Sequence, residues 1–206
     1  MIKNSQIAHN LRQPDDDYIP PELIGVTHMT PEQFERVCRK NRKLRLELTS
    51  AGELIVMPPT SPLTGKRNSN LTRQLDVWAE NDGSGVCFGD TAGFTLPNNA
   101  IRSPDASWMR REKWDSLSQE QQERFASICP DFVVELRSRT DRLPTLLSKM
   151  EEYMENGASL GWLIDPSTRR VYIYRPNEDV VVLENPENVS GEPLLPGFTL
   201  NLTKLW

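Results

Sequence analysis

Residues 131–165 have the sequence DFVVELRSRTDRLPTLLSKMEEYMENGASLGWLID, and this stretch carries the strongest fold signal in the chain. Side chains alternate over 131–137, which predicts a β-strand with Phe132, Val134 and Leu136 on one face. A helix is expected over 143–156, with Pro144 in its first turn and Gly157 just past its end. The apolar run 161–165 predicts a second strand. Strand, helix and strand in this order imply a right-handed crossover between parallel neighbours.

Shorter elements are expected on both sides of this unit. A helix begins at Thr30, because Pro31 suits the first helical position and Gln33 completes a capping box. The other expected elements are a hairpin (44–48 and 54–57), an amphipathic helix (66–80), strands (86–88, 94–96, 101–109, 171–175 and 180–183) and a short helix (118–125). The predicted fold is therefore α/β (mixed α+β), with a mixed central β-sheet flanked by helices and extra antiparallel hairpins.

Length and composition favour one globular domain over residues 26–206, preceded by a polar arm over 1–25. The 206 residues contain no apolar run near the ~20 residues that cross a bilayer, so no membrane partner is expected. Three widely spaced cysteines without a CxxC motif favour reduced thiols in a cytoplasmic protein and argue against zinc. Two histidines give little support to a histidine metal site. The net charge of -5 argues against a protein that coats DNA, but allows a local basic cleft.

Two carboxylates stand inside strand-like runs. Asp105 lies in SPDAS (103–107) and Glu135 in FVVELR (132–137). Strands rarely bury an acid without a partner, and a pair on neighbouring strands predicts a divalent-cation site. Magnesium commonly uses one or two carboxylates with substrate phosphate, and such a cation promotes phosphodiester hydrolysis. Two alternatives stay open: Asp105 bonds nearby backbone amides in a turn, or Glu135 pairs with Arg137, Arg110 or Arg111.

A cation beside these acids would orient a water or stabilise the phosphorus. Arg137 follows Glu135 by two residues, but a guanidinium does not act as a base. Lys149 lies beside Tyr153 at the edge of the buried stripe of the predicted helix, from which it can reach a cleft above the strands. The alternative for Lys149 is an ordinary flanking lysine that buries only its stem.

Four motifs together resemble the Uma-two family, restriction-endonuclease-like proteins of the PD-(D/E)XK nuclease superfamily: SPDAS (103–107), CPDFVVELRS (129–138), KMEEY (149–153) followed by Gly157, and WLIDP (162–166). The resemblance covers about residues 30–206. It implies a restriction-endonuclease-like core, Asp105 and Glu135 as ligands of magnesium or manganese, and cleavage of DNA phosphodiester bonds. It also suggests Glu47 as a further acid near the site.

The chain departs from the superfamily pattern at one position. The superfamily motif is acid-x-lysine, whereas this chain has Glu135-Leu136-Arg137, with arginine in the place of the lysine. Activity then requires that Lys149 has taken the role of the lysine. Ser138 and Arg139 follow the strand and are candidates for phosphate contact. The leading prediction is a metal-dependent DNA endonuclease, and the alternative is a catalytically degenerate binding or oligomerisation module. A homo-oligomer, with a dimer as the simplest form, is expected, and exposed Trp108, Trp114 and Trp206 are candidate contacts, although tryptophans more often pack in a core.

Overall fold

A six-stranded mixed β-sheet forms the centre of the protein, with strand order β10-β9-β8-β7-β6-β3. The computed structural model describes residues 28–206, so the predicted arm over 1–25 lies outside the described residues. The strands are β3 (Gly85–Gly89), β6 (Ala106–Arg110), β7 (Phe132–Leu136), β8 (Leu160–Asp165), β9 (Arg170–Tyr174) and β10 (Val181–Glu184). β7 and β8 run parallel and are connected through helix α5 (Leu143–Glu155), which confirms the predicted crossover.

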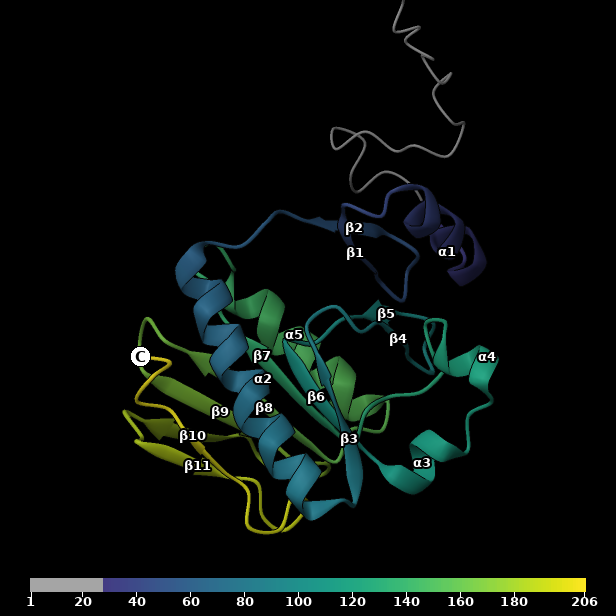
Figure 1. Cartoon of the computed structure of the whole chain (residues 1–206). Coiled ribbons are helices and arrows are strands. Elements are labelled where there is room, and N and C mark those ends of the chain that lie inside the picture. Colours follow the sequence, from purple (N-terminus) through teal and green to yellow (C-terminus); the bar gives the residue numbers. More distant parts are fainter. Residues whose placement is uncertain (1–27) are drawn as a thin grey trace, which may run out of the picture.

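Helices cover both faces of this sheet (Figure 1): α2 (Pro62–Asp82) on one face and α5 on the other. Successive side chains of β7 point to opposite faces of the sheet, and each set packs against one of these two helices. Phe132, Val134 and Leu136 pack in one core cluster with Leu71 and Leu75 of α2. Val133 belongs to a second cluster with Met150 and Tyr153 of α5. The prediction of a mixed sheet flanked by helices is confirmed.

A second, four-stranded sheet has the order β2-β1-β5-β4 and lies beside helix α1 (Pro31–Lys40). Its strands are β1 (Arg45–Leu48), β2 (Leu54–Met57), β4 (Phe94–Thr95) and β5 (Ile101–Arg102). Phe34 and Val37 of α1 pack with Leu48 and Ile101 of the sheet. The predicted hairpin and the capping box of Thr30 and Gln33 are confirmed. The remaining elements are α3 (Arg111–Asp115), α4 (Gln119–Gln122), β11 (Asn188–Ser190) and β12 (Thr199–Asn201).

Several predicted boundaries differ from the structure, and the helix predicted over 118–125 covers only Gln119–Gln122. Helix α2 begins at Pro62 rather than 66, because Ser61 caps it by accepting the Thr64 N–H at 3.2 Å. The strand predicted over 101–109 is two strands in different sheets, and Ser103, Pro104 and Asp105 join them. Helix α5 begins after Arg142 without a side-chain cap, and Asp141 accepts the Ser138 N–H at 2.7 Å in the preceding loop.

The predicted exposure of Trp108 was also wrong. Trp108 is 2% exposed and lies in the core cluster between α2 and the central sheet. Trp206 packs against the same cluster, and the ring of Trp114 contacts Phe88 with 5.1 Å between centroids. Cys38, Cys87 and Cys129 are free thiols. Among the described helices, none has the length and apolar character that a bilayer crossing requires.

Candidate active site

Asp105 directly precedes β6, and its side chain reaches β7 beside Glu135. The antiparallel register of β6 and β7 pairs Ala106 with Val134, so Asp105 and Glu135 occupy the next pair of positions. Asp105 Oδ2 accepts the Leu136 N–H at 2.8 Å, and Oδ1 accepts an N–H of the Asn68 side chain at 2.8 Å. Both donors are remote in sequence, so Asp105 is more than a local turn residue.

Lys149 of α5 contacts Glu135. Its Nζ lies 2.8 Å from Glu135 Oε1, which also accepts the Tyr153 hydroxyl at 3.0 Å. Lys149 and Tyr153 are one helical turn apart, so both side chains face the central sheet from the same side of α5. The sequence had left open that Glu135 pairs with an arginine, but in the structure its cationic contact is Lys149.

The three candidate arginines have other contacts. Arg110 pairs with Asp131 at 2.8 Å, and Arg111 donates to the carbonyls of Gly83 and Gly85. Arg137 pairs with Asp165 at 2.7 Å. None of these three arginines therefore pairs with Glu135 in the described structure, and Lys149 does.

Glu47 approaches the same lysine from the smaller sheet. Its Oε1 lies 2.8 Å from Lys149 Nζ and accepts the Ser103 N–H at 2.9 Å. Its Oε2 accepts from Arg102 Nη1 at 3.2 Å. Lys149 therefore bridges β1 of one sheet and β7 of the other, at the place where the chain passes between the sheets through Asp105.

Burial shifts the pKa values of these groups in different directions. Burial raises the pKa of Glu135, and the charges of Asp105 and Glu47 add to this effect, so that it reaches about 7 in spite of Lys149. Burial also raises the pKa of Asp105. For Glu47, burial is outweighed by Lys149 and Arg102, which lower its pKa. Burial alone would lower the pKa of Lys149, but Glu135 and Glu47 raise it, so the amine stays protonated at neutral pH.

The site has more negative than positive charge. We call it the acid cluster, and its described members are four carboxylates and two cations: Glu47, Asp105, Glu135, Glu152, Lys149 and Arg102. The charge of Arg45 also lowers the pKa of Asp105, but Arg45 itself is paired with Asp90 at 3.3 Å. Acidic groups therefore outnumber cations in a largely buried place, which favours protonation of Asp105 and Glu135, and a divalent cation there would stabilise their deprotonated forms.

The donor set fits magnesium or manganese better than zinc. Within residues 28–206, no three histidine, cysteine or acidic side chains are grouped as a complete metal site. Magnesium needs fewer protein ligands, since it keeps several waters and commonly uses one or two carboxylates with substrate phosphate. Asp105 and Glu135 would hold it, because the other two acids, Glu47 and Glu152, accept hydrogen bonds from Arg102 on the far side of Lys149.

The other sequence candidates lie outside the acid cluster. Arg137 is held by Asp165 and also donates to the Asp141 carbonyl at 3.3 Å. The Ser138 hydroxyl contacts Thr140 at 3.1 Å in the loop after β7. Within residues 28–206, neither side chain forms a hydrogen bond with an acid of the cluster, and their role in phosphate contact stays a prediction.

Sequence reasoning missed Asn68, Arg102 and a role for Tyr153. Asn68 had a usable signal, because it occupies the buried stripe of α2 with Leu71 and Leu75, where a polar side chain needs a partner. Tyr153 follows Lys149 by one turn. Arg102 had no such signal, because only the tertiary structure brings it between Glu47 and Glu152.

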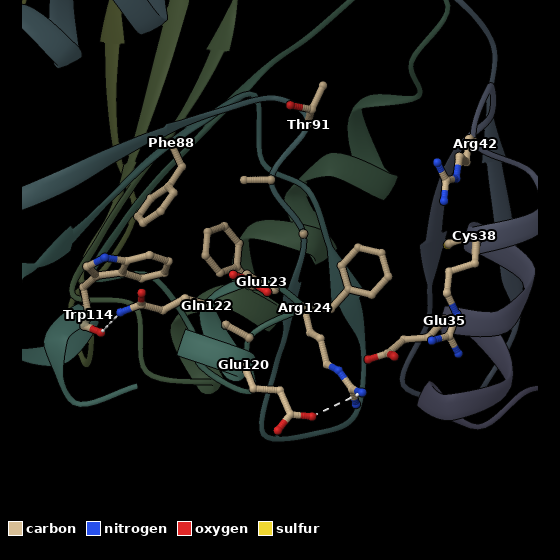
Figure 2. A pocket seen from close by; sticks show the side chains of 16 residues that line it. Glu35, Cys38, Arg42, Phe88, Thr91, Trp114, Glu120, Gln122, Glu123 and Arg124 are labelled. Atoms are coloured by element: carbon tan, nitrogen blue, oxygen red, sulfur yellow. Dashed lines mark hydrogen bonds and ion pairs between the residues drawn. The ribbon is translucent and has the colours of Figure 1, made fainter. Parts of the chain in front are cut away.

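A cavity of about 710 Å³ lies away from the acid cluster, between α1, the segment after β3 and α4. Figure 2 shows Glu35 of α1 and Arg42, just after this helix, on one side and Phe88 and Trp114 on the other. Arg124 in its wall is paired with Glu120 at 3.3 Å. Its arginines and glutamates are mixed, so the charge of the cavity favours neither an anionic nor a cationic ligand. We therefore place the candidate chemistry at the carboxylates.

The fold is that of the restriction-endonuclease-like class, and it places one acid just before β6, one on β7 and a lysine on the crossover helix α5 in the same region. The family model described as "Uma2: Putative restriction endonuclease" matches residues 31–203, and the chain belongs to this family. The predicted family resemblance is confirmed. No curated protein matches the chain.

A solved structure has the same fold. It is described as "a putative nuclease belonging to DUF820 from Anabaena variabilis", with a TM-score of 0.68 and 20% sequence identity. The match covers 86% of this chain and 97% of that chain. At this identity the likeness shows the fold alone, and the predicted restriction-endonuclease-like core is confirmed.

Proposed function

We propose that the protein is a divalent-cation-dependent endonuclease that hydrolyses DNA phosphodiester bonds at the acid cluster. Asp105 and Glu135 would hold magnesium or manganese, which would polarise the scissile phosphate and lower the pKa of an attacking water. The observation that carries the proposal is the placement of two buried acids, Asp105 and Glu135, beside Lys149, with more acidic groups than cations in the acid cluster. Membership of a family described as restriction endonucleases supports nucleic acid as the substrate class.

The protein's own residues have distinct parts in this proposal. Asp105 is oriented by the Leu136 N–H and by Asn68, so its oxygens are fixed before a substrate arrives. Lys149 stays protonated and therefore acts as a hydrogen-bond donor, which orients water or stabilises negative charge on the phosphate, and not as a general base. Glu47 and Tyr153 act as positioning residues, because one contacts Lys149 and the other contacts Glu135.

A plasmid-nicking assay tests the proposal. Supercoiled DNA is incubated with the full chain and Mg²⁺ or Mn²⁺, with RNA as a second substrate, and the variants Asp105→Asn and Glu135→Gln are compared with wild type. We expect metal-dependent nicking that falls by at least about 100-fold in both variants, because each removes a proposed ligand charge. Glu151→Gln is the matched control, since Glu151 is an exposed acid on the same helix as Lys149. Thermal unfolding shows whether each variant is folded.

Two outcomes would contradict the proposal. Folded Asp105→Asn or Glu135→Gln with wild-type activity removes the role of that residue. A wild-type protein that binds the cation but cleaves neither DNA nor RNA would favour the alternative of a non-catalytic module. Homodimer formation is a separate proposal, and light scattering of the full chain checks it.

A further inference from the structure

Asn68 is a buried side chain with one unused hydrogen-bonding atom. It lies on the face of α2 that packs on the central sheet, and it is 5% exposed. Its Nδ2 donates to Asp105 Oδ1 at 2.8 Å, whereas its Oδ1 has no hydrogen-bond partner within the described structure. A buried acceptor without a donor costs about 1–3 kcal/mol. Such a cost is acceptable where a ligand supplies the missing interaction.

The orientation of this amide is fixed by Asp105. Exchanging its oxygen and nitrogen would place the carbonyl oxygen against the Asp105 carboxylate, and two acceptors do not bond. The unpaired oxygen is therefore adjacent to a proposed cation ligand. A phosphate or carboxylate would be repelled by both groups, whereas a cation is attracted to both. Amide oxygens are suitable ligands for hard divalent cations.

The acid cluster also has few carboxylate oxygens that are free to bind a cation, because two of its acids already accept several hydrogen bonds. Glu47 accepts from Lys149, Arg102 and Ser103, and Glu152 accepts from Arg102 and Asn98. Asp105 and Glu135 remain, and the grouped acids of residues 28–206 do not supply a third ligand. An oxygen beside Asp105 would increase the number of protein ligands without adding negative charge.

We propose that Asn68 has two functions: its Nδ2 orients Asp105, and its Oδ1 is a third protein oxygen for the cation held by Asp105 and Glu135. This inference rests on the proposed metal site and names a ligand from α2 that the acid-based motifs do not contain. The competing explanation is that Asn68 only orients Asp105.

Calorimetric titration of the full chain with MnCl₂ separates these two explanations. We expect Asn68→Ala to weaken manganese binding by about tenfold, in the range for loss of groups that support a metal site. Asn68→Asp should bind within about threefold of wild type or more tightly, because its carboxylate replaces the lost oxygen ligand. Asn81→Ala is the matched control, since Asn81 is an exposed asparagine on the same helix that bonds the Val77 carbonyl.

The aspartate variant gives the decisive comparison. If Asn68 only orients Asp105, then Asn68→Asp places a like charge against that carboxylate and binding falls at least as far as in Asn68→Ala. That result, or wild-type affinity in Asn68→Ala, would overturn the inference while the metal site stands. A wild-type chain that binds no manganese would overturn the metal site and this inference together. If Asn68→Ala does not fold, the manganese affinity of Asn68→Asp alone tests the inference: binding within about threefold of wild type supports it, and weaker binding overturns it.

Discussion

Replacing Lys149 with methionine removes the cation that joins the two sheets. Lys149 Nζ lies 2.8 Å from both Glu47 and Glu135, and these carboxylate side chains are 3% and 6% exposed. Glu47 keeps Arg102 and the Ser103 N–H, but Glu135 keeps only the Tyr153 hydroxyl among its described hydrogen bonds. Glu135 is therefore the group that loses its charge partner.

The structure sets the size of the expected loss. Removing one partner of a buried ion pair costs about 3–5 kcal/mol, and the lower end applies because the Lys149 side chain is 11% exposed. Lys149→Met should thus lose about 3 kcal/mol of unfolding free energy. The double variant Lys149→Met, Glu135→Gln should be within about 1 kcal/mol of wild type, because the unpaired charge is gone and the amide oxygen still accepts from Tyr153.

Urea unfolding followed by tryptophan fluorescence measures both values, since Trp108 and Trp162 are buried in the core. The buffer contains a chelator, so that bound metal does not add stability. Lys204→Met, at an exposed lysine, is the control and should change stability by less than about 0.5 kcal/mol. The reasoning fails if Lys149→Met is as stable as this control, or if the double variant is less stable than Lys149→Met.

Three further predictions concern stability. Tyr153→Phe removes the hydroxyl that donates to Glu135 at 3.0 Å and should cost about 1–2 kcal/mol in urea unfolding; no change would show that this bond contributes nothing. Asp165→Asn should cost about 2 kcal/mol at neutral pH, because Asp165 loses its charge-assisted bond with Arg137. The folded-state pKa of Asp165 lies below its ordinary value, although burial opposes this, because Ser167 and Arg137 bond its carboxylate. The stability that Asp165 contributes is therefore present above its unfolded pKa of about 3.9 and is lost as pH falls through its folded pKa. The difference in unfolding free energy between wild type and Asp165→Asn should thus disappear below about pH 4. A difference that does not change with pH would contradict this role of the Asp165 charge. Gly85→Ala should cost about 3 kcal/mol of unfolding free energy, because an added Cβ would lie 2.4 Å from the rigid Met109 carbonyl. Gly161→Ala should cost only about 1 kcal/mol, because its Cβ would lie 2.5 Å from the flexible end of the Met150 side chain. Equal shifts of the two melting temperatures would contradict this comparison.

The central part of the fold followed from local patterns in the sequence. Residues 131–165 combine an alternating strand pattern, an amphipathic helix followed by Gly157 and an apolar strand, and the structure contains β7, α5 and β8 in these places. The break at residues 103–105 of the run 101–109 was not predicted, although Pro104-Asp105 is a frequent turn dipeptide. The two halves of that run belong to different sheets, and strand pairing over long sequence distances decides this.

The candidate site followed from the sequence in part. Asp105 and Glu135 were found because acids in strand-like runs need partners, and the Asp105 carboxylate accepts the N–H of Leu136, the residue after Glu135. Lys149 was a choice between a site residue and a surface residue, and its two ion pairs favour the site. The contacts of Glu47 with Arg102 and of Arg102 with Glu152 join segments about 50 residues apart, and no local pattern predicts them.

Crystals of the full chain grown with MnCl₂ test the central claim most directly. Manganese scatters anomalously, so its position is seen independently of activity. The account predicts an anomalous peak within coordination distance, about 2.0–2.2 Å, of carboxylate oxygens of both Asp105 and Glu135. A well-ordered site without a peak there, or manganese bound only elsewhere, would contradict it.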